Sequence, residues 1–437
     1  MKKFLSGLLL FLIVIVWLVV WTALPWFLIL ALTVLLALWL GLTRGGRRTL
    51  SVTRVGLSTL GARLGSTAVI VVGIAGVVGV LVALLAMGEG LSATLKQTGS
   101  DQTAIVLRGG AGGEANSVLT RDQIDVIAQA PGVAKGANGQ PIASAEIAVI
   151  TNIPKKSDPG SDANVSLRGV GEAAWTVWPN VHIVEGRKFQ PGLRELVVGR
   201  AAQQQFVGLG LGQQLKLSGQ EWTIVGVFES GDAHASELWG DEKSVASAYR
   251  RGSSAQSVTV QLTSPAAFDA FKAALTSDPR LRVDVDTTRA FYGKQSEGFT
   301  KVIRVVGITI GVIMAIGAIF GALNTMYAAV ATRAREIATL RAIGFRGLPV
   351  VVSVLLETML LALLGGALGA AIVWLVFNGY TASTLGGNFS QVVFEFRVTP
   401  KLIWTGIKWA LAIGFVGGLF PAMRAARLPV TTALREL

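Results

Sequence analysis

Cysteine is absent from the 437 residues, and histidine occurs twice, at His182 and His234. Without cysteine the chain can form neither a disulfide framework nor a thiolate metal site, and it has no thiolate nucleophile. The two histidines lie far apart in the sequence, and neither belongs to a cluster with ligand spacing. We therefore expect no metal site.

Recognisable enzyme motifs are missing as well. The glycine-rich run R-G-G-A-G-G, which starts at Arg108, does not end in Gly-Lys-Ser/Thr, and Gly293-Lys294 is followed by Gln295. Neither place fits a nucleotide-binding loop. The sequence also contains no H-E-x-x-H motif, no Ser/His/Asp order and no paired carboxylates in an apolar setting. We predict that the chain is not an enzyme and holds no catalytic or cofactor-binding site.

Apolar residues, in contrast, are abundant. They make up 51% of the sequence, and the mean hydropathy is +0.57, which is too apolar for an ordinary soluble protein. The net charge of +13 is unevenly distributed: the segments expected on the cytoplasmic side hold 14 Lys and Arg against 2 acidic residues, whereas residues 89–300 hold 20 against 22. Such an imbalance sets membrane orientation by the positive-inside rule. The chain is therefore predicted to be a membrane protein that contacts lipid and binds no nucleic acid.

The N-terminal apolar stretch is unusually long. Lys2 and Lys3 precede an uncharged run from Phe4 to Gly41 that Pro25 interrupts near its middle. A spanning helix needs roughly 20 residues, so we predict a transmembrane hairpin over residues 1–42. A cleaved signal peptide is the alternative, but the run is too long for one and no A-x-A site follows it.

Residues 43–65 contain five arginines and no acidic residue, which places them on the cytoplasmic side. Leu50, Leu57, Leu60 and Leu64 fall close to one helical face. This pattern favours an amphipathic helix at the membrane interface. A solvated basic linker is the competing interpretation.

The remainder of the chain alternates apolar runs with polar segments, and the charge bias puts both ends of the chain on the cytoplasmic side. The predicted order is a first core transmembrane helix over 66–88, a polar domain over 89–300, a second core helix over 301–331, a cytoplasmic segment over 332–346, a third core helix over 347–378, a short outer loop over 379–400, a fourth core helix over 401–422 and a cytoplasmic tail over 423–437.

The polar domain has a mixed pattern. Thr120 and Gln123 form a capping box for a helix that runs to about Ala130. Short strand candidates with glycine punctuation surround this helix. They cover residues 103–107, 145–151, 165–170, 195–198, 214–217, 222–228, 258–262 and 281–285, with a second helix over 265–275.

The last two of these strands and the helix between them form a β-α-β sequence, which indicates an α+β domain. Two polar stretches interrupt the pattern, from Gly109 to Ser117 and from Pro154 to Asn164. We expect both to be mobile loop tips and not sites.

Residues Thr332 to Arg346 read T-R-A-R-E-I-A-T-L-R-A-I-G-F-R between two apolar runs. Ile337, Leu340 and Ile343 recur at three-residue spacing, which predicts an amphipathic helix pressed against one face of the membrane. Gly344 is expected to end it. Such a cationic helix can lie in the lipid headgroups or dock into a groove on a cytoplasmic partner, and the pattern permits both.

Glu357 lies about eight residues into the third core helix, hence roughly 12 Å deep. A carboxylate at that depth is costly unless it is paired, hydrated or protonated, so we expect it to face the interior of the helix bundle. It serves either conformational coupling or a dimer interface, or it makes a purely structural bond. The pairs Gly317 with Gly321 and Gly365 with Gly369 have the small-xxx-small spacing that permits close helix contact.

The run R-E-I-A-T-L-R-A-I-G from Arg335 resembles the signature between the second and third core spans of MacB/FtsX-like ABC transporter permeases. This family includes the macrolide exporter, the lipoprotein-release permeases and FtsX. Three further stretches resemble the same family in the same order: R-L-G-S-T-A-V-I-V-V-G from Arg63, L-L-E-T-M-L-L-A-L-L-G-G from Leu355, and G-L-F-P-A-M-R-A-A-R from Gly418. The family core does not require the N-terminal hairpin, whose role stays open.

The resemblance implies an α-helical membrane protein with four core transmembrane helices and a large α+β domain similar to the MacB-like periplasmic core. It implies a coupling helix that sits in a separate cytoplasmic ABC ATPase, which would use ATP and Mg²⁺. The residues of this chain that would carry ATPase coupling are Arg333, Arg335, Glu336, Leu340, Arg341, Ile343 and Gly344.

Further partners are implied by the same resemblance. They are a second permease copy or paralogue in a dimer, a periplasmic adaptor and an outer-membrane channel, with the chain in the bacterial inner membrane and its large domain in the periplasm. The function implied is ATP-driven export or extraction of a substrate by mechanotransmission. The alternative is an FtsX-like or sensor-type regulator of a cell-wall enzyme or signalling partner. A neighbouring gene for a periplasmic adaptor would favour the export function. A neighbouring gene for a hydrolase or a sensor kinase would favour the regulatory function.

Overall fold

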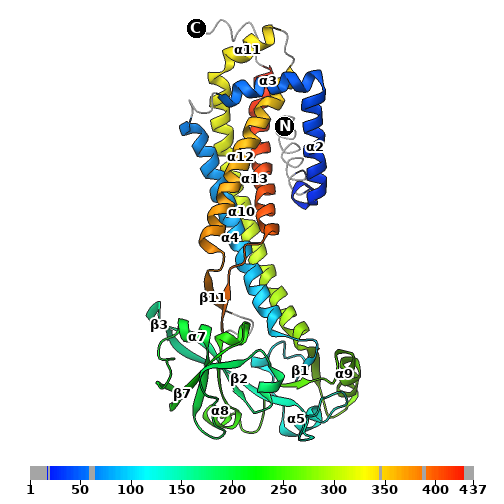
Figure 1. The fold of residues 1–437 in the computed structure, drawn as a ribbon, viewed down its shortest axis with the longest axis vertical. Coiled ribbons are helices and arrows are strands. Elements are labelled where there is room, and N and C mark those ends of the chain that lie inside the picture. Colours follow the sequence, from blue (N-terminus) through cyan, green and yellow to red (C-terminus); the bar gives the residue numbers. More distant parts are fainter. Residues whose placement is uncertain (1–16, 18–19, 59–63, 344–346, 386–389, 428–437) are drawn as a thin grey trace, which may run out of the picture. The chain divides into compact units, whose positions relative to one another are not determined.

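The apolar runs form long helices in the computed structural model, which describes residues 17, 20–58, 64–343, 347–385 and 390–427 (Figure 1). The helices belong to a membrane unit, made of the described residues of 1–86, 303–378 and 397–437. A polar unit is made of the described residues of 87–302 and 379–396. The polar domain is therefore discontinuous in sequence.

Among the described residues of the membrane unit, α4, α10, α12 and α13 are long and apolar enough to cross a membrane. They confirm the four predicted core helices. The helices of this unit are α2 (Trp26–Leu42), α3 (Arg44–Ser58), α4 (Leu64–Thr98), α10 (Thr288–Thr332), α11 (Ala334–Ala342), α12 (Gly347–Phe377) and α13 (Pro400–Arg427).

Two core helices are longer than predicted. We expected the first to end at residue 88 and the second to begin at 301, but α4 continues to Thr98 and α10 begins at Thr288. The additional turns belong to the polar unit, where Leu91 and Leu95 are buried on α4 and Phe291 is buried on α10. Burial of these apolar side chains stabilises a helix beyond the uncharged run, which hydropathy alone does not predict.

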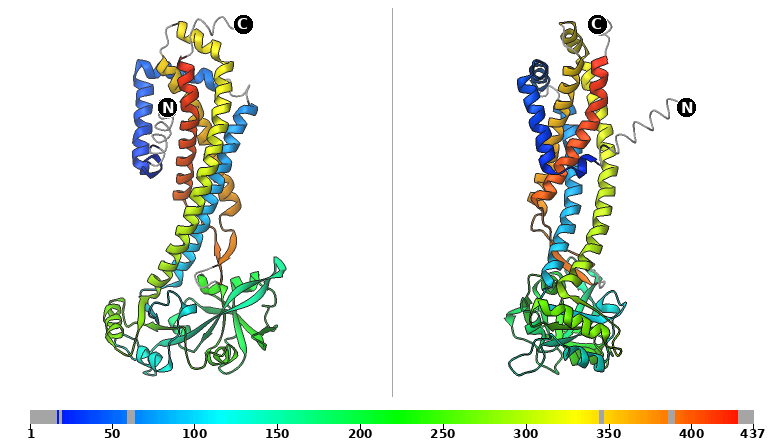
Figure 2. Two further views of the ribbon diagram at one scale, coloured as in Figure 1. Left: turned by 180° about the vertical axis from the view of Figure 1, so that it is seen from behind. Right: turned by 90° about the vertical axis from the view of Figure 1, so that its right-hand side faces the viewer.

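The first helix of the predicted N-terminal hairpin falls largely outside the described residues, so the hairpin stays a prediction. The described part begins its helix α2 directly after Pro25, and α2 and α3 meet at an angle of 94°. Figure 2 shows α2 running alongside the other helices of the membrane unit. Trp21 on the preceding turn donates its indole N–H to the backbone oxygen of Lys408 at 2.9 Å, which attaches this segment to α13.

Helix α3 confirms the predicted helix after the hairpin, but its buried face differs from the expected one. Leu50 and Leu57 are half-buried, and Leu60 lies outside the described residues. The helix packs against α12, and small side chains allow this close approach where leucines would not. The buried residues of α3 are Gly46, Thr49, Val52, Thr53 and Gly56.

Close contacts between glycines and small residues also join the core helices. A Cβ placed on Gly366 of α12 would lie 2.6 Å from the Cβ of Ala410 on α13, and one on Gly365 would lie 2.7 Å from the backbone oxygen of Val71 on α4. No larger side chain fits at either position. Small residues therefore allow α12 to approach α4 and α13 closely.

The polar unit is built on a ten-stranded mixed sheet with the order β10-β1-β9-β2-β3-β8-β5-β7-β4, and β6 pairs with β7 off this path. The pairs β3–β8 and β5–β7 are parallel and the others are antiparallel. Its strands are β1 (Thr103–Arg108), β2 (Ala143–Lys155), β3 (Asp158–Val170), β4 (His182–Gly186), β5 (Glu195–Gly199), β6 (Gln214–Leu217), β7 (Gln220–Glu229), β8 (Leu238–Asp241), β9 (Ser257–Gln261) and β10 (Val283–Thr287).

Two hydrophobic cores lie along this sheet. One is formed by β2, β3, β5, β7 and neighbouring helices around Trp222 and Phe206, and the other by β1, β9 and β10 around Phe271. The helices of the polar unit are α5 (Arg121–Ala128), α6 (Ala174–Val177), α7 (Arg200–Gln205), α8 (Glu242–Ala248) and α9 (Phe268–Ser277), with 3₁₀ turns η2 (Glu114–Asn116), η3 (Ala233–Ser236) and η4 (Pro265–Ala267). The α+β class and the capping box of Thr120 and Gln123 are confirmed.

Three expectations for the polar segments were wrong. Residues 154–164 form most of the end of the β2–β3 hairpin, because Ile153 pairs with Ala163 and Pro154 with Asp162. The loop that starts at Gly109 contains Glu114, which is fully buried. Residues 379–400 are not a simple loop, because β11 (Thr381–Leu385) and β12 (Gln391–Glu395) form a ribbon that belongs to the polar unit.

Candidate functional site

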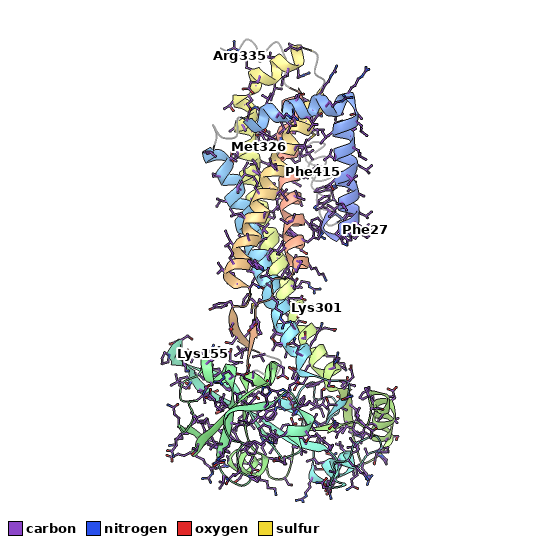
Figure 3. All side chains as sticks on the ribbon, viewed as in Figure 1. Phe27, Lys155, Lys301, Met326, Arg335 and Phe415 are labelled. Carbon is purple, nitrogen blue, oxygen red and sulfur yellow. The ribbon has the colours of Figure 1, made fainter. Side chains whose placement is uncertain are left out.

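The predicted coupling segment is a short helix between two long ones. Helix α10 ends at Thr332, Arg333 occupies the N-cap position with φ −104° and ψ 9°, and α11 covers Ala334–Ala342. Ile337 and Ala338 are buried, whereas Arg335 and Glu336 are exposed. Figure 3 shows Arg335 on α11 at one end of the membrane unit. A charged surface of α11 therefore faces outward from this unit.

Arg333 connects three helices at this corner. Its Nη1 lies 3.1 Å from Oε2 of Glu357 on α12, and its Nε lies 3.1 Å from Oε2 of Glu336 on α11. The Glu357 side chain is 4% exposed and the Arg333 side chain 14% exposed. The buried carboxylate of Glu357 is thus paired, and its partner is the guanidinium of Arg333 at the end of α10. A planar guanidinium can serve two carboxylates at once, which suits it to such a corner.

Helix α3 completes the corner. A Cβ placed on Gly56 would lie 3.0 Å from Oε2 of Glu357 and 3.3 Å from Nη1 of Arg333. The ion pair is therefore covered by the backbone of α3. We call Gly56, Arg333, Glu336 and Glu357 the coupling corner. Sequence reasoning missed Gly56, although the small residues of α3 recur at helical spacing and could have indicated its packed face.

The other predicted coupling residues lie around this corner. Leu340 and Arg341 are half-buried on α11, and Ile343, the C-cap residue, is 73% exposed and not part of an apolar packed face. Exposure of Ile343 within the single chain does not test the expected contact of this apolar stripe with lipid or with a partner, which stays a prediction. Gly344, predicted to end the helix, lies outside the described residues.

The predicted glycine pairs behave differently from one another. Gly365 and Gly369 on α12 both lie against the backbone of α4. Gly317 and Gly321 on α10 have no described residue within 4 Å of where a Cβ would stand. The first pair packs helices within one chain, and the second pair is left without a packing partner among the described residues.

A second polar cluster, not predicted, lies inside the polar unit. Arg168 on β3 is 2% exposed and donates from Nη1 to Oε1 of Glu114 at 2.8 Å and to Oε2 of Glu146 at 2.7 Å, and from Nε to Oε2 of Glu237 at 2.8 Å. Trp178 donates to Glu146 at 2.8 Å. An arginine inside the apolar strand sequence V-S-L-R-G-V was the sequence signal for this cluster.

The carboxylates of this cluster are not equivalent. Burial raises the pKa of each, but at Glu114 and Glu237 the charge and the hydrogen bonds of Arg168, together with further hydrogen bonds and charges, outweigh burial, and the pKa values lie below the usual range. At Glu146 burial prevails over Arg168, and the pKa is raised. Nearby, burial lowers the pKa of His234, but the charge and hydrogen bond of Asp232 outweigh it and raise the pKa. The polar cluster therefore keeps the charged Arg168 and its carboxylate partners inside the domain.

Neither cluster resembles a catalytic centre. Among the residues that the structure describes, no group of three or more acidic or histidine side chains is arranged to hold a metal ion. The carboxylates of the polar cluster are occupied by Arg168 and by the indole of Trp178. The ion pairs of the coupling corner join the end of α10 to α11 and α12.

Two family models match most of the chain. The MacB-like periplasmic core domain matches residues 67–278. The FtsX-like permease C-terminal domain matches residues 308–430 and thus contains α11, α12 and the described part of the coupling corner except Gly56.

Macrolide export ATP-binding/permease proteins are similar to this chain over part of their length. The macrolide export ATP-binding/permease protein MacB of Shewanella oneidensis is 30% identical over 155 residues, which are 35% of this chain and 22% of the relative. MacB of Vibrio parahaemolyticus serotype O3:K6 is 30% identical over 152 residues, again 35% of this chain and 22% of the relative. The matched part of the chain therefore spans less than a quarter of these relatives.

Two solved structures are similar at low identity. The extracellular domain of the ABC-type transporter YknZ from Gram-positive bacteria is 16% identical with a TM-score of 0.33, covering 42% of this chain and 100% of that one. The periplasmic region of MacB from Actinobacillus actinomycetemcomitans is 14% identical with a TM-score of 0.34, covering 46% of this chain and 94% of that one.

Proposed function

Because the chain belongs to the MacB/FtsX-like family of ABC transporter permeases, we propose that it couples ATP hydrolysis by a separate cytoplasmic ATPase to movements of its periplasmic domain. These movements drive export or extraction of a substrate. The chain itself supplies the membrane helices and a MacB-like periplasmic domain. ATP and Mg²⁺ would be bound by the ATPase partner.

The observation that carries this proposal is the coupling corner. Helix α11 presents Arg335 and Glu336 outward and is tied through Arg333 to the end of α10 and to Glu357 of α12. A partner that docks on the exposed charges and shifts α11 must therefore shift Arg333 as well. The displacement reaches two membrane helices through one guanidinium.

Two continuous helices support the proposed transmission of displacement from the membrane unit to the polar unit. Helices α4 and α10 each run without a break through residues of the membrane unit and of the polar unit. An α-helix transmits displacement along its axis because its hydrogen bonds run parallel to that axis. The β11–β12 ribbon gives a third covalent connection, between α12 and α13.

The membrane helices favour mechanical work over a hydrophilic channel. Glu357 in α12 is paired with Arg333. Lys408 in α13 donates from Nζ to the backbone oxygen of Thr22 at 2.6 Å. Since both of these intramembrane charges bind groups of the same chain, we propose that the substrate is handled in the periplasm.

The assembly we propose is a permease dimer in the inner membrane of a bacterial cell, formed with a second copy or a paralogue. Two cytoplasmic ATPase subunits bind to this dimer. The exposed face of α10 that includes Gly317 and Gly321 is available for contact with the second permease. A periplasmic adaptor and an outer-membrane channel would complete an export pathway.

Charge reversal on α11 tests the docking of the ATPase. In Arg335→Glu and Arg341→Glu, we expect the ATPase to co-purify at least about tenfold less. A like-charge contact at an interface costs several kcal/mol, and about 1.4 kcal/mol already lowers the affinity tenfold. ATP hydrolysis by the remaining complex should fall in parallel. Arg427→Glu is the matched control, since Arg427 is an exposed arginine on the last turn of α13 and not on α11. Wild-type co-purification and hydrolysis in both α11 variants would contradict the proposal.

A further inference from the structure

Helix α3 has two opposite faces of different chemistry. Its buried face consists of small residues and packs against α12, with Gly56 in contact with the coupling corner. At about 100° per residue, the four arginines of α3 fall on the side away from Thr49 and Thr53. These arginines, Arg44, Arg47, Arg48 and Arg54, are all exposed.

The arginine face carries no compensating charge. Between residues 20 and 88 the described chain contains no acidic residue, so no carboxylate of this stretch neutralises the four guanidinium groups. Val55 is 47% exposed on the same side, and Leu42, at the end of α2, is 72% exposed. Cationic groups interleaved with exposed apolar side chains are typical of helices that lie in a lipid interface.

The direction of this face follows from its packing. Helix α12 is long and apolar enough to cross a membrane, and α3 packs against its side, bent by 94° from α2. The face opposite α12 therefore points outward along the membrane plane and not toward the cytoplasm. Figures 1 and 2 show α3 crossing the helices near the end of the membrane unit that carries α11. The groups that surround a membrane protein sideways at this level are lipid headgroups.

We propose that the arginine face of α3 binds the headgroups of anionic phospholipids in the cytoplasmic leaflet. Guanidinium groups form charge-assisted, bidentate hydrogen bonds with phosphate oxygens, and juxtamembrane basic residues are attracted to anionic lipid surfaces. Lipid bound on one face of α3 holds its other face, including Gly56, against the Arg333–Glu357 pair. The binding requires that α12 crosses a membrane and does not depend on the proposed ATPase partner.

Native mass spectrometry of the purified full chain in detergent tests this binding. The probes are phosphatidylglycerol and phosphatidylcholine with identical acyl chains, added at equal concentration. We expect the wild-type chain to retain phosphatidylglycerol at least about fivefold more than phosphatidylcholine, the effect of a single arginine near an anionic surface. The variant R44Q/R47Q/R48Q/R54Q should bind the two lipids within about twofold of each other.

A variant that loses the same number of positive charges elsewhere distinguishes binding by the arginine face of α3 from an effect of the net charge of the protein. R335Q/R341Q/R424Q/R427Q removes four arginines from α11 and α13 and should keep the wild-type preference for phosphatidylglycerol. The variant R44K/R47K/R48K/R54K keeps the charge and should retain most of the preference. Thermal unfolding of each variant at the wild-type temperature is the check that the fold is intact.

Three results would overturn the proposal. One is a wild-type chain without preference for phosphatidylglycerol, which would leave an acidic protein surface as the partner of the arginine face. Another is an unchanged preference in R44Q/R47Q/R48Q/R54Q. The third is an equal loss in R335Q/R341Q/R424Q/R427Q, which would show that net charge alone governs the binding.

Discussion

At the scale of single residues, the decisive feature is one arginine placed where two helices meet. Arg333 interrupts the helical run from α10 to α11 and binds carboxylates on α11 and α12 with equal distances of 3.1 Å. Its pairing with Glu357 explains why a carboxylate is tolerated inside α12, because an unpaired buried charge is unfavourable by several kcal/mol. The ion pair that stabilises α12 is therefore the same one to which we assign the proposed coupling.

Glu357→Gln should destabilise the protein, because it leaves Arg333, whose side chain is 14% exposed, without its buried partner. Breaking a buried pair costs about 3–5 kcal/mol, and the remaining bond from Arg333 to Glu336 reduces this to about 1–3 kcal/mol. The measurement is thermal unfolding of the purified chain. The double variant Arg333→Gln/Glu357→Gln should recover part of the loss, and Glu336→Gln, at an exposed position, should change stability by less than about 0.5 kcal/mol. Equal effects of Glu336→Gln and Glu357→Gln would contradict this assignment.

The polar unit should be most stable in mildly acidic solution. The raised pKa of His234 means that its proton stabilises the fold below about pH 6.5, and this contribution is lost as the pH rises through the folded value. Glu146, whose pKa is also raised, acts in the same direction from about pH 4.5 upward. Glu114 and Glu237, with lowered pKa values, contribute above about pH 4.5 and lose this contribution as the pH falls further.

Melting curves at pH 6 and pH 9 check the alkaline limb. Each unit by which the pKa of His234 is raised stabilises the fold by about 1.4 kcal/mol, which corresponds to roughly 2–4 °C in Tm. His234→Gln should remove most of the difference between the two pH values. His182→Gln is the control, because His182 is exposed. A variant of His234 with the full wild-type pH dependence would exclude this residue as the cause.

At the scale of elements, the polar unit is completed by a segment from the far end of the sequence. Val392, Val393 and Phe394 of β12 are buried, and the backbone N–H of Val393 donates to Oγ of Ser236 at 2.8 Å. The ribbon therefore contributes to the fold of the polar unit although more than 75 residues separate it from residue 302. The predicted boundaries 89–300 leave it out.

A fragment of residues 87–302 joined by a flexible linker to residues 379–396 should unfold at a higher temperature than residues 87–302 alone. Burial of each large apolar side chain contributes about 1.5–3 kcal/mol, so we expect a difference of at least about 4 °C. Phe394→Ala in the joined fragment should abolish most of the gain, whereas Glu395→Ala, at an exposed position, should not. Equal melting temperatures with and without the ribbon would show that it contributes little.

At the scale of the whole molecule, the proposed function requires the two units to lie in different surroundings, one in the membrane and the other in the periplasm. Their connections are the helices α4 and α10 and the ribbon between α12 and α13. In the proposed mechanism, a displacement that starts at α11 reaches the polar unit through these segments of the chain.

The absence of cysteine makes this arrangement directly measurable. Thr339→Cys on α11 and Glu221→Cys on β7 introduce single thiols at exposed positions. In cells with a permeabilised outer membrane, a membrane-impermeant maleimide should label Glu221→Cys at least about tenfold faster than Thr339→Cys, and lysis should equalise the two. Equal labelling before lysis would place both residues in one compartment and refute coupling across the membrane.

The sequence by itself determined the four core spans, the α+β class of the polar domain, a helix within residues 332–346 and the family, because apolar run length, periodicity and motif order are local properties. It also indicated that Glu357 needs a partner. It did not identify Arg333 as that partner, or Arg168 as the centre of the polar cluster. Only tertiary structure decided these pairings.

The physical reason is that ion pairs and packing depend on residues that folding brings together. Arg333 and Glu357 are 24 positions apart, Arg168 and Glu114 are 54 apart, and Lys408 and Thr22 are 386 apart. The long ends of α4 and α10 and the place of the β11–β12 ribbon likewise depend on burial against distant parts of the chain. A linear pattern shows which side chains must be buried or paired, and the fold decides by what.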